Sequence, residues 1–203
     1  DQIASLTRIH DIALLNEHFF EDSNDLTKAI RIEGYDISNF GASGKVGSMV
    51  VFDNSGPVKS EYRRFTIKSV AGQSDVDCLE EVIVRRMKHL EWQYPSILLI
   101  DGGLPQVRRV FAVLQQLQID IPIVGIAKGA ERKKNEFVFP QKNAELISWV
   151  NDHQTLLISV RDEAHRAVRH RRNHRREGWQ DRDPHAERAG RGHARGHQDF
   201  QDR

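Results

Sequence analysis

The sequence contains little cysteine and no long apolar run. Cys78 is the one cysteine among 203 residues, so it cannot form an internal disulfide or a cysteine metal site. No apolar stretch approaches the roughly 20 residues that span a bilayer, and the mean hydropathy is -0.58. The start, Asp1 to Ala13, lacks the basic beginning and apolar core of a secretory signal. We therefore expect a cytoplasmic protein that is not in a membrane, with Cys78 as a small buried residue.

The final segment, 167–203, lacks the residues that build a core. After Val168 it contains no isoleucine, leucine, methionine or valine, and arginine, histidine, glycine and aspartate dominate. Such a segment cannot bury enough apolar surface to offset the entropy lost on ordering, so we predict a disordered basic tail. The interspersed acids, such as Asp181 and Glu187, and the abrupt change of composition favour a frameshift in the source gene as its origin. A native disordered tail and a small folded module are the alternatives.

The net charge is only +1, but the basic residues are clustered. The arginine pair Arg63 and Arg64 and the group from Lys128 to Lys134, which includes Arg132, are two such clusters. Clusters of this kind can form a track for the phosphates of a nucleic acid. Lysine and arginine are also ordinary surface residues, so each cluster alone is equally compatible with a solvated face.

Apolar periodicity in the first third of the chain predicts a helix followed by strands. Residues 3–20 have helical spacing, so we expect an amphipathic helical lead-in over 1–27. Three strands are then predicted, from Ala29 to Tyr35, Ser48 to Phe52 and Glu61 to Lys68, with turn residues between them. Their connections are too short for parallel crossovers, which indicates an antiparallel meander.

After Gly72 the pattern alternates between helices and buried strands. Ser74 or Asp75 can cap a helix, and the continuous apolar run Ile97 to Ile100 is typical of a strand buried on both faces. The remaining elements that we expect are a helix over 105–117, a strand over 121–126 and a helix over 154–166. The prediction is an α/β domain over 28–166, with a mixed sheet and flanking helices.

Three polar residues follow or interrupt apolar elements. Asp36 is expected at the end of the first strand, Asp101 ends a buried strand, and His165 is on the last helix. Two carboxylates at the carboxyl end of a sheet repel one another unless a divalent cation lies between them, and Mg²⁺ or Mn²⁺ prefers such oxygen ligands. From spacing alone, a turn at Asp101 and a loop cap at Asp36 explain the pattern equally well.

Six colinear segments resemble the endonuclease domain of the excision-repair family UvrC, and together they extend over about residues 28 to 166. These segments are 31–39 (RIEGYDISN), 51–57 (VFDNSGP) with 59–65 (KSEYRRF), 74–75 (SD), 99–103 (LIDGG), 125–129 (GIAKG) with 131–132 (ER), and 161–166 (RDEAHR). The resemblance implies a ribonuclease H-like fold, in agreement with the meander and the strand, helix, strand unit that follows it.

The resemblance also implies a chemistry. By similarity to the family, Asp36, Asp101 and His165 form the catalytic group and Asp75 is a further site residue. The chemistry of the residues adds that Asp36 and Asp101 would hold Mg²⁺ or Mn²⁺ and that His165 would orient water or shuttle a proton. The implied activity is hydrolysis of a phosphodiester 5′ to a lesion in double-stranded DNA, with UvrB as partner after UvrA has recognised the damage. We expect Arg63, Arg64, Lys128 and Arg132 to contact the DNA. The chain lacks the family's GIY-YIG, UvrB-binding and helix-hairpin-helix modules, so we interpret it as a fragment of the family architecture. Activity and inactivity of the fragment without those modules are both compatible with the sequence.

Two other functions compete with this interpretation. The domain could be a non-catalytic nucleic-acid-binding protein on a degenerate nuclease scaffold, or a ribonuclease H-like enzyme with another activity, such as RNA cleavage or strand transfer. Convergence of the Asp36, Asp101 and His165 side chains distinguishes the nuclease from the scaffold. Relatives with the other activities usually carry a third carboxylate where this chain has His165.

Overall fold

The computed structural model describes residues 30–39, 44–68, 74–129 and 135–169. The predicted helical lead-in over 1–27, the tail from residue 170 onward and Arg132 lie outside these residues. No helix in the described part of the chain is both long and apolar enough to cross a membrane.

The described strands form one seven-stranded mixed sheet. In chain order they are β1 (Ile32–Asn39), β2 (Lys45–Asp53), β3 (Gly56–Pro57), β4 (Arg63–Thr66), β5 (Ile97–Asp101), β6 (Ile123–Lys128) and β7 (Asn135–Val138). The sheet order is β3-β2-β1-β5-β6-β7, and β4 also pairs with β2. The antiparallel pairs β1–β2 and β2–β4 confirm the predicted meander, and β5 is parallel to both β1 and β6.

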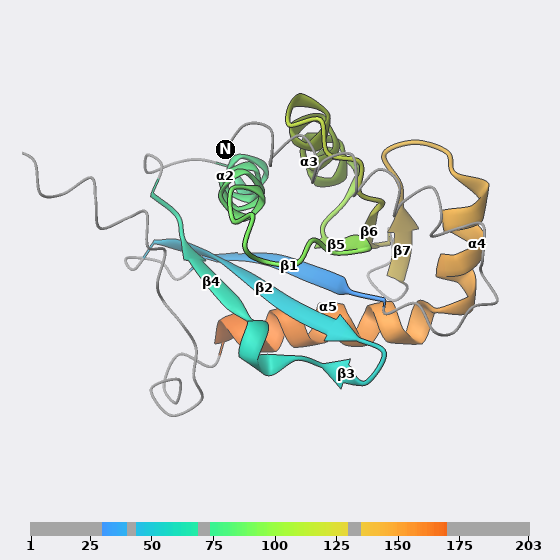
Figure 1. Cartoon of the computed structure of the whole chain (residues 1–203). Coiled ribbons are helices and arrows are strands. Elements are labelled where there is room, and N and C mark those ends of the chain that lie inside the picture. The colour runs from blue at the N-terminus through green and yellow to red at the C-terminus, as the bar shows by residue number, and fades with distance from the viewer. Residues whose placement is uncertain (1–29, 40–43, 69–73, 130–134, 170–203) are drawn as a thin grey trace, which may run out of the picture.

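Helices cover both faces of this sheet (Figure 1). On one face lie α2 (Asp75–Met87) and α3 (Leu104–Gln116), and α5 (Gln154–Arg169) lies on the other. The short helices η2 (Lys59–Glu61) and α4 (Ala144–Asp152) complete the described elements. The Ser74 hydroxyl accepts a hydrogen bond from the Asp77 amide, which confirms the predicted cap of α2.

Three features differ from the sequence prediction. The first strand does not end before Asp36, because its ladder with β2 continues to the pair Asn39 and Lys45. The segment around Phe137 forms β7, antiparallel to β6, and α4 follows it, whereas the sequence predicted no element between residues 126 and 154. Finally, α5 continues to Arg169 because Ala167 and Val168 are buried against the core, so the helix passes the predicted end at residue 166.

The core consists of apolar side chains between the sheet and its helices. The buried strand β5 contributes four consecutive residues, and α2 contributes a face that includes Val82 and Ile83. Cys78 is buried in the same helix, as predicted. Burial of this apolar surface is the main source of stability, at about 25 cal/mol per Å² removed from water.

A buried ionic network joins β1 to α2. Glu33 accepts hydrogen bonds from Arg86 Nη2 at 2.8 Å, from Arg31 Nη2 at 3.1 Å and from the Tyr35 hydroxyl at 2.6 Å. The side chains of Glu33 and Arg86 are fully buried. Burial, followed by the charge of Glu33, raises the pKa of Tyr35 well above its ordinary value. Because the carboxylate has several donors around it, the network fixes β1 against α2 without leaving its charge unpaired.

Candidate active site

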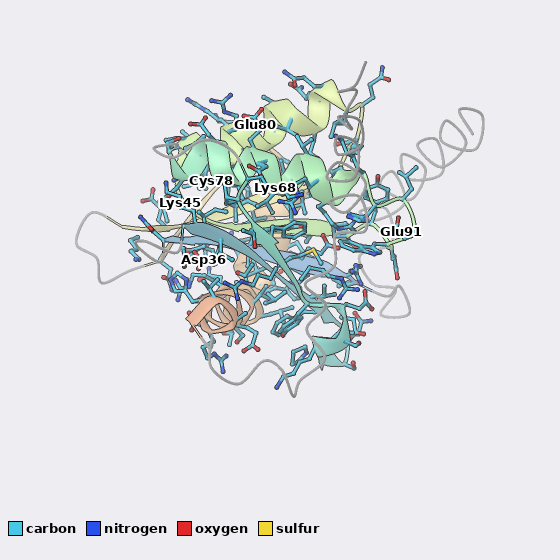
Figure 2. All side chains as sticks on the ribbon, turned by 90° about the vertical axis from the view of Figure 1, so that its left-hand side faces the viewer. Asp36, Lys45, Lys68, Cys78, Glu80 and Glu91 are labelled. Atoms are coloured by element: carbon cyan, nitrogen blue, oxygen red, sulfur yellow. The ribbon has the colours of Figure 1, made fainter. Side chains whose placement is uncertain are left out.

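Asp36 lies within β1 on the face that α5 covers. Figure 2 shows it between the sheet and α5, whereas Cys78 and Glu80 lie on the opposite side. Only 5% of the Asp36 side chain is exposed. The Ser38 hydroxyl donates a hydrogen bond to Asp36 Oδ2 at 2.9 Å, which holds the carboxylate in one orientation.

Asp101 is the last residue of β5, next to Asp36 across the sheet. Tyr35 pairs with Ile100 in the parallel β1–β5 register, so the following residue on each strand is an aspartate. His165 Nδ1 lies 3.1 Å from Asp36 Oδ2 and 3.3 Å from Asp101 Oδ2. The three side chains offer ligand atoms that all lie within 4.8 Å of one another. The structure therefore brings together the three residues that the sequence had singled out.

The site concentrates negative charge in a partly buried position. Burial raises the pKa of the Asp101 carboxyl; His165 lowers it, and the charge of Asp36 together with hydrogen bonding to Asp36 raises it again. The net shift is upward, so ionised Asp101 is destabilised by its surroundings. A cation placed among these groups would instead stabilise the ionised carboxylates. Two carboxylates and an imidazole are a donor set that can hold a divalent cation, so the residues present fit such an ion.

Ser48 joins the two backbone segments that carry the site. Its buried hydroxyl lies 3.1 Å from the Ala164 carbonyl, next to His165, and 3.5 Å from the carbonyl of Asp36. Ser48 also pairs with Asp36 in the β1–β2 register. The sequence reasoning missed this residue, although a small polar residue in the otherwise apolar run from Val46 to Phe52 was a usable signal.

Gly34 allows α5 to approach the sheet closely enough to place His165. A Cβ atom at Gly34 would lie 2.5 Å from Val160 Cγ1, which is closer than two carbon atoms can pack. Val160 precedes His165 by five residues on α5. Because Gly34 lies two residues before Asp36 and Ala164 contacts Ser48, α5 runs alongside β1 in the same direction. A small residue at this crossing therefore determines the depth at which His165 enters the site.

The other residues predicted for the site lie apart from the three-residue cluster. Asp75 is exposed at the start of α2, and its carboxylate pairs with Lys45 Nζ at 3.0 Å. Arg63 Nη1 donates to the carbonyls of Ser60 and Tyr62, and its guanidinium lies over the Trp92 ring at 4.8 Å.

Arg64 and Lys128 lie on opposite sides of the cluster. Arg64 pairs with Ser48 from the outer strand β4, two strands away from β1. Lys128 is exposed at the carboxyl end of β6. It comes two residues after Ile126, which pairs with Asp101, so alternation places it on the same face as the cluster. Arg132 is not described.

The fold and site together define a class. A meander that leads into parallel strands, with helices on both faces and carboxylates on the two central strands, is a ribonuclease H-like arrangement.

Comparison with known proteins identifies the family within that class. The model of the UvrC RNase H endonuclease domain matches residues 22–168. The chain belongs to this family. It is 40% identical over 146 residues to UvrABC system protein C of Methanococcoides burtonii and 39% identical over 136 residues to that of Clostridioides difficile. The matches cover 69% and 67% of this chain, but only 24% and 22% of those relatives. The chain thus spans about a quarter of their length.

Solved structures give a more distant likeness. A crystal structure of human ENDOV aligns with a TM-score of 0.41 and 19% identity, over 71% of this chain and 66% of that chain. Endonuclease V from Bacillus subtilis aligns with a TM-score of 0.34 and 18% identity, over 59% and 55% of the two chains.

Proposed function

We propose that this domain is a divalent-metal-dependent DNA endonuclease of nucleotide excision repair that makes the incision 5′ to a lesion. The observation that carries the proposal is the convergence of Asp36, Asp101 and His165 within 4.8 Å. Membership of the UvrC endonuclease family supports a phosphodiester as the bond that is cleaved.

Asp36 and Asp101 are the residues that would hold Mg²⁺ or Mn²⁺. When bound, such an ion supplies Lewis acidity for phosphodiester hydrolysis. His165, with 31% of its side chain exposed, presents Nδ1 to both carboxylates, and its imidazole would orient a water molecule or shuttle a proton. Ser38 orients the Asp36 carboxylate, and Ser48 keeps β1 and α5 together. Asp75 lies apart from this cluster, paired with Lys45, and stays a candidate for an auxiliary role.

The substrate that we propose is damaged double-stranded DNA, delivered by UvrB after recognition by UvrA. The names of the relatives as UvrABC system protein C support this assignment of partners. Lys128 is the best placed of the predicted DNA contacts, because it extends from the strand next to β5 on the face of the site. Arg64, on the other side of the cluster, would contact DNA that extends past α5. Arg63 is less able to contact DNA, because its guanidinium is held against the Trp92 ring. A DNA substrate agrees with a cytoplasmic location.

A cleavage assay tests the proposal. The chain is incubated with a labelled DNA duplex that contains a bubble, in Mn²⁺, Mg²⁺ or EDTA, beside Asp101→Asn and the matched control Asp120→Asn, which alters an exposed aspartate. We expect metal-dependent nicking by the wild type and by Asp120→Asn, and none by Asp101→Asn. Nicking that persists in Asp101→Asn would refute the assignment. DNA binding with no cleavage in any metal, with and without UvrB, would favour the non-catalytic scaffold.

A further inference from the structure

Arg161 lies one helical turn before His165 on α5, and residues four apart on a helix lie on the same side of it. Arg161 Nη1 donates a hydrogen bond to Asn135 Oδ1 of β7. Asn135 pairs with Lys128, so Arg161 and Lys128 lie at the same rim of the site.

Hydrogen bonds hold the guanidinium of Arg161 in place, and the carboxylate that it pairs with is exposed. Nε and Nη2 donate to a single oxygen, Asp162 Oδ1, at 3.0 and 2.7 Å. Asp162 is 51% exposed, whereas Arg161 is 17% exposed. Ion pairs with such an exposed carboxylate contribute little stability, so a competing anion can replace Asp162. Asn135, which is neutral, orients the group without cancelling its charge.

We propose that Arg161 binds a phosphate of the DNA strand at the active site, with its planar fork contacting the non-bridging oxygens. This inference rests on the proposed nuclease function and adds a substrate-contacting residue to it. A guanidinium matches the geometry of a phosphate better than an ammonium group does, because it presents two parallel N–H donors. Arg161 lies one helical turn before His165 on α5 and is bonded to Asn135 of β7, and the paired residue Lys128 extends the positive rim on the side of β6.

The competing explanation is that Arg161 only ties α5 to β7. The two roles differ in a measurable way, because each phosphate contact releases counterions from DNA. Loss of one contact lowers the slope of log affinity against log salt concentration by about 0.9. A structural tie changes the melting temperature and leaves that slope unchanged.

The test compares Arg161→Gln, Arg161→Lys and the control Arg109→Gln with the wild type. Arg109 is a partly exposed arginine on α3, on the opposite face, where it pairs with Asp77 and Glu80. Binding of a labelled bubble duplex is titrated over a range of salt concentrations in EDTA. We expect a slope lower by about 0.9 in Arg161→Gln only, with the slope retained in Arg161→Lys and in Arg109→Gln. An Arg161→Gln slope equal to that of the wild type, or an equal loss in Arg109→Gln, would overturn the proposal.

A second measurement separates this proposal from the nuclease assignment. The Mn²⁺-induced rise in melting temperature should be kept by Arg161→Gln and lost by Asp101→Asn. Absence of that rise in the wild type would contradict the metal site. It would not affect the assignment of Arg161 to phosphate, which the salt slopes decide. Loss of the rise in Arg161→Gln would mean that Arg161 acts on the metal site and would overturn its assignment to phosphate.

Discussion

Replacing Asp101 with asparagine should stabilise the metal-free protein. The ligand atoms of Asp36 and Asp101 lie no more than 4.8 Å apart. Two unit charges at that separation repel by about 0.9 kcal/mol at a dielectric constant of about 80, and by about 3.5 kcal/mol at about 20. The substitution also removes the attraction to His165, so we expect a net gain of about 1–2 kcal/mol. For a domain of this size, that gain corresponds to a rise in melting temperature of about 2–8 °C.

The assay is thermal unfolding in EDTA as a function of pH. Because the folded pKa of Asp101 is raised, the folded state binds its proton more tightly than the unfolded state does. That contribution to stability is present below the unfolded pKa of about 3.9 and is lost as pH rises through the folded pKa. Asp101→Asn should therefore match the wild type in acid and exceed it towards neutral pH. A variant that is less stable than the wild type at pH 7 would show that the carboxylate is structural and would refute the reasoning.

Other residues give independent predictions. Glu33→Gln should lower the free energy of unfolding in urea by about 3–5 kcal/mol, because it leaves Arg86 buried without its anion. Glu61 also pairs with Arg31, but its side chain is 41% exposed, so Glu61→Gln should lower that free energy by less than about 1 kcal/mol. A comparable loss in both would contradict the buried pairing. Gly34→Ala should destabilise by about 1–3 kcal/mol and weaken Mn²⁺ binding, because the added methyl group displaces α5 and His165. Unchanged Mn²⁺ affinity would show that the position of α5 does not matter to the site. Ser48→Ala should cost about 1 kcal/mol, measured by the same denaturation, and a stability equal to that of the wild type would mean that its hydroxyl does not tie β1 to α5.

The sequence predicted elements well where burial alone determines the pattern. The apolar run before Asp101 was typical of a buried strand, and the meander followed from short connections rich in turn residues. It predicted poorly where tertiary contacts compensate for polar residues. Strand β1 continues through Ser38 and Asn39 because β2 completes its ladder, and β7 forms beside β6 although Asn135 and Glu136 are polar.

The three central residues of the site stand out as polar residues at the end of, or within, apolar elements. That pattern alone left a turn and a loop cap equally open, and the resemblance to the UvrC endonuclease family assigned them to the site. Their supporting residues were harder to find. In the sequence alone, Glu33 and Arg86 look like surface charges. They become partners only because α2 packs on β1. Arg161 had a weak signal, since it is four residues before His165, but its hydrogen bond to Asn135 on β7 depends on how α5 crosses the sheet.

Calorimetric titration with Mn²⁺ tests the central claim most directly, because metal binding does not depend on the partners or on the segments of the longer relatives. The samples are the wild type, Asp36→Asn, Asp101→Asn and the exposed control Asp120→Asn. We expect saturable binding by the wild type and by Asp120→Asn, and an affinity at least about tenfold weaker in both site variants. Equal Mn²⁺ affinity in all four proteins would contradict the assignment of Asp36 and Asp101 as metal ligands.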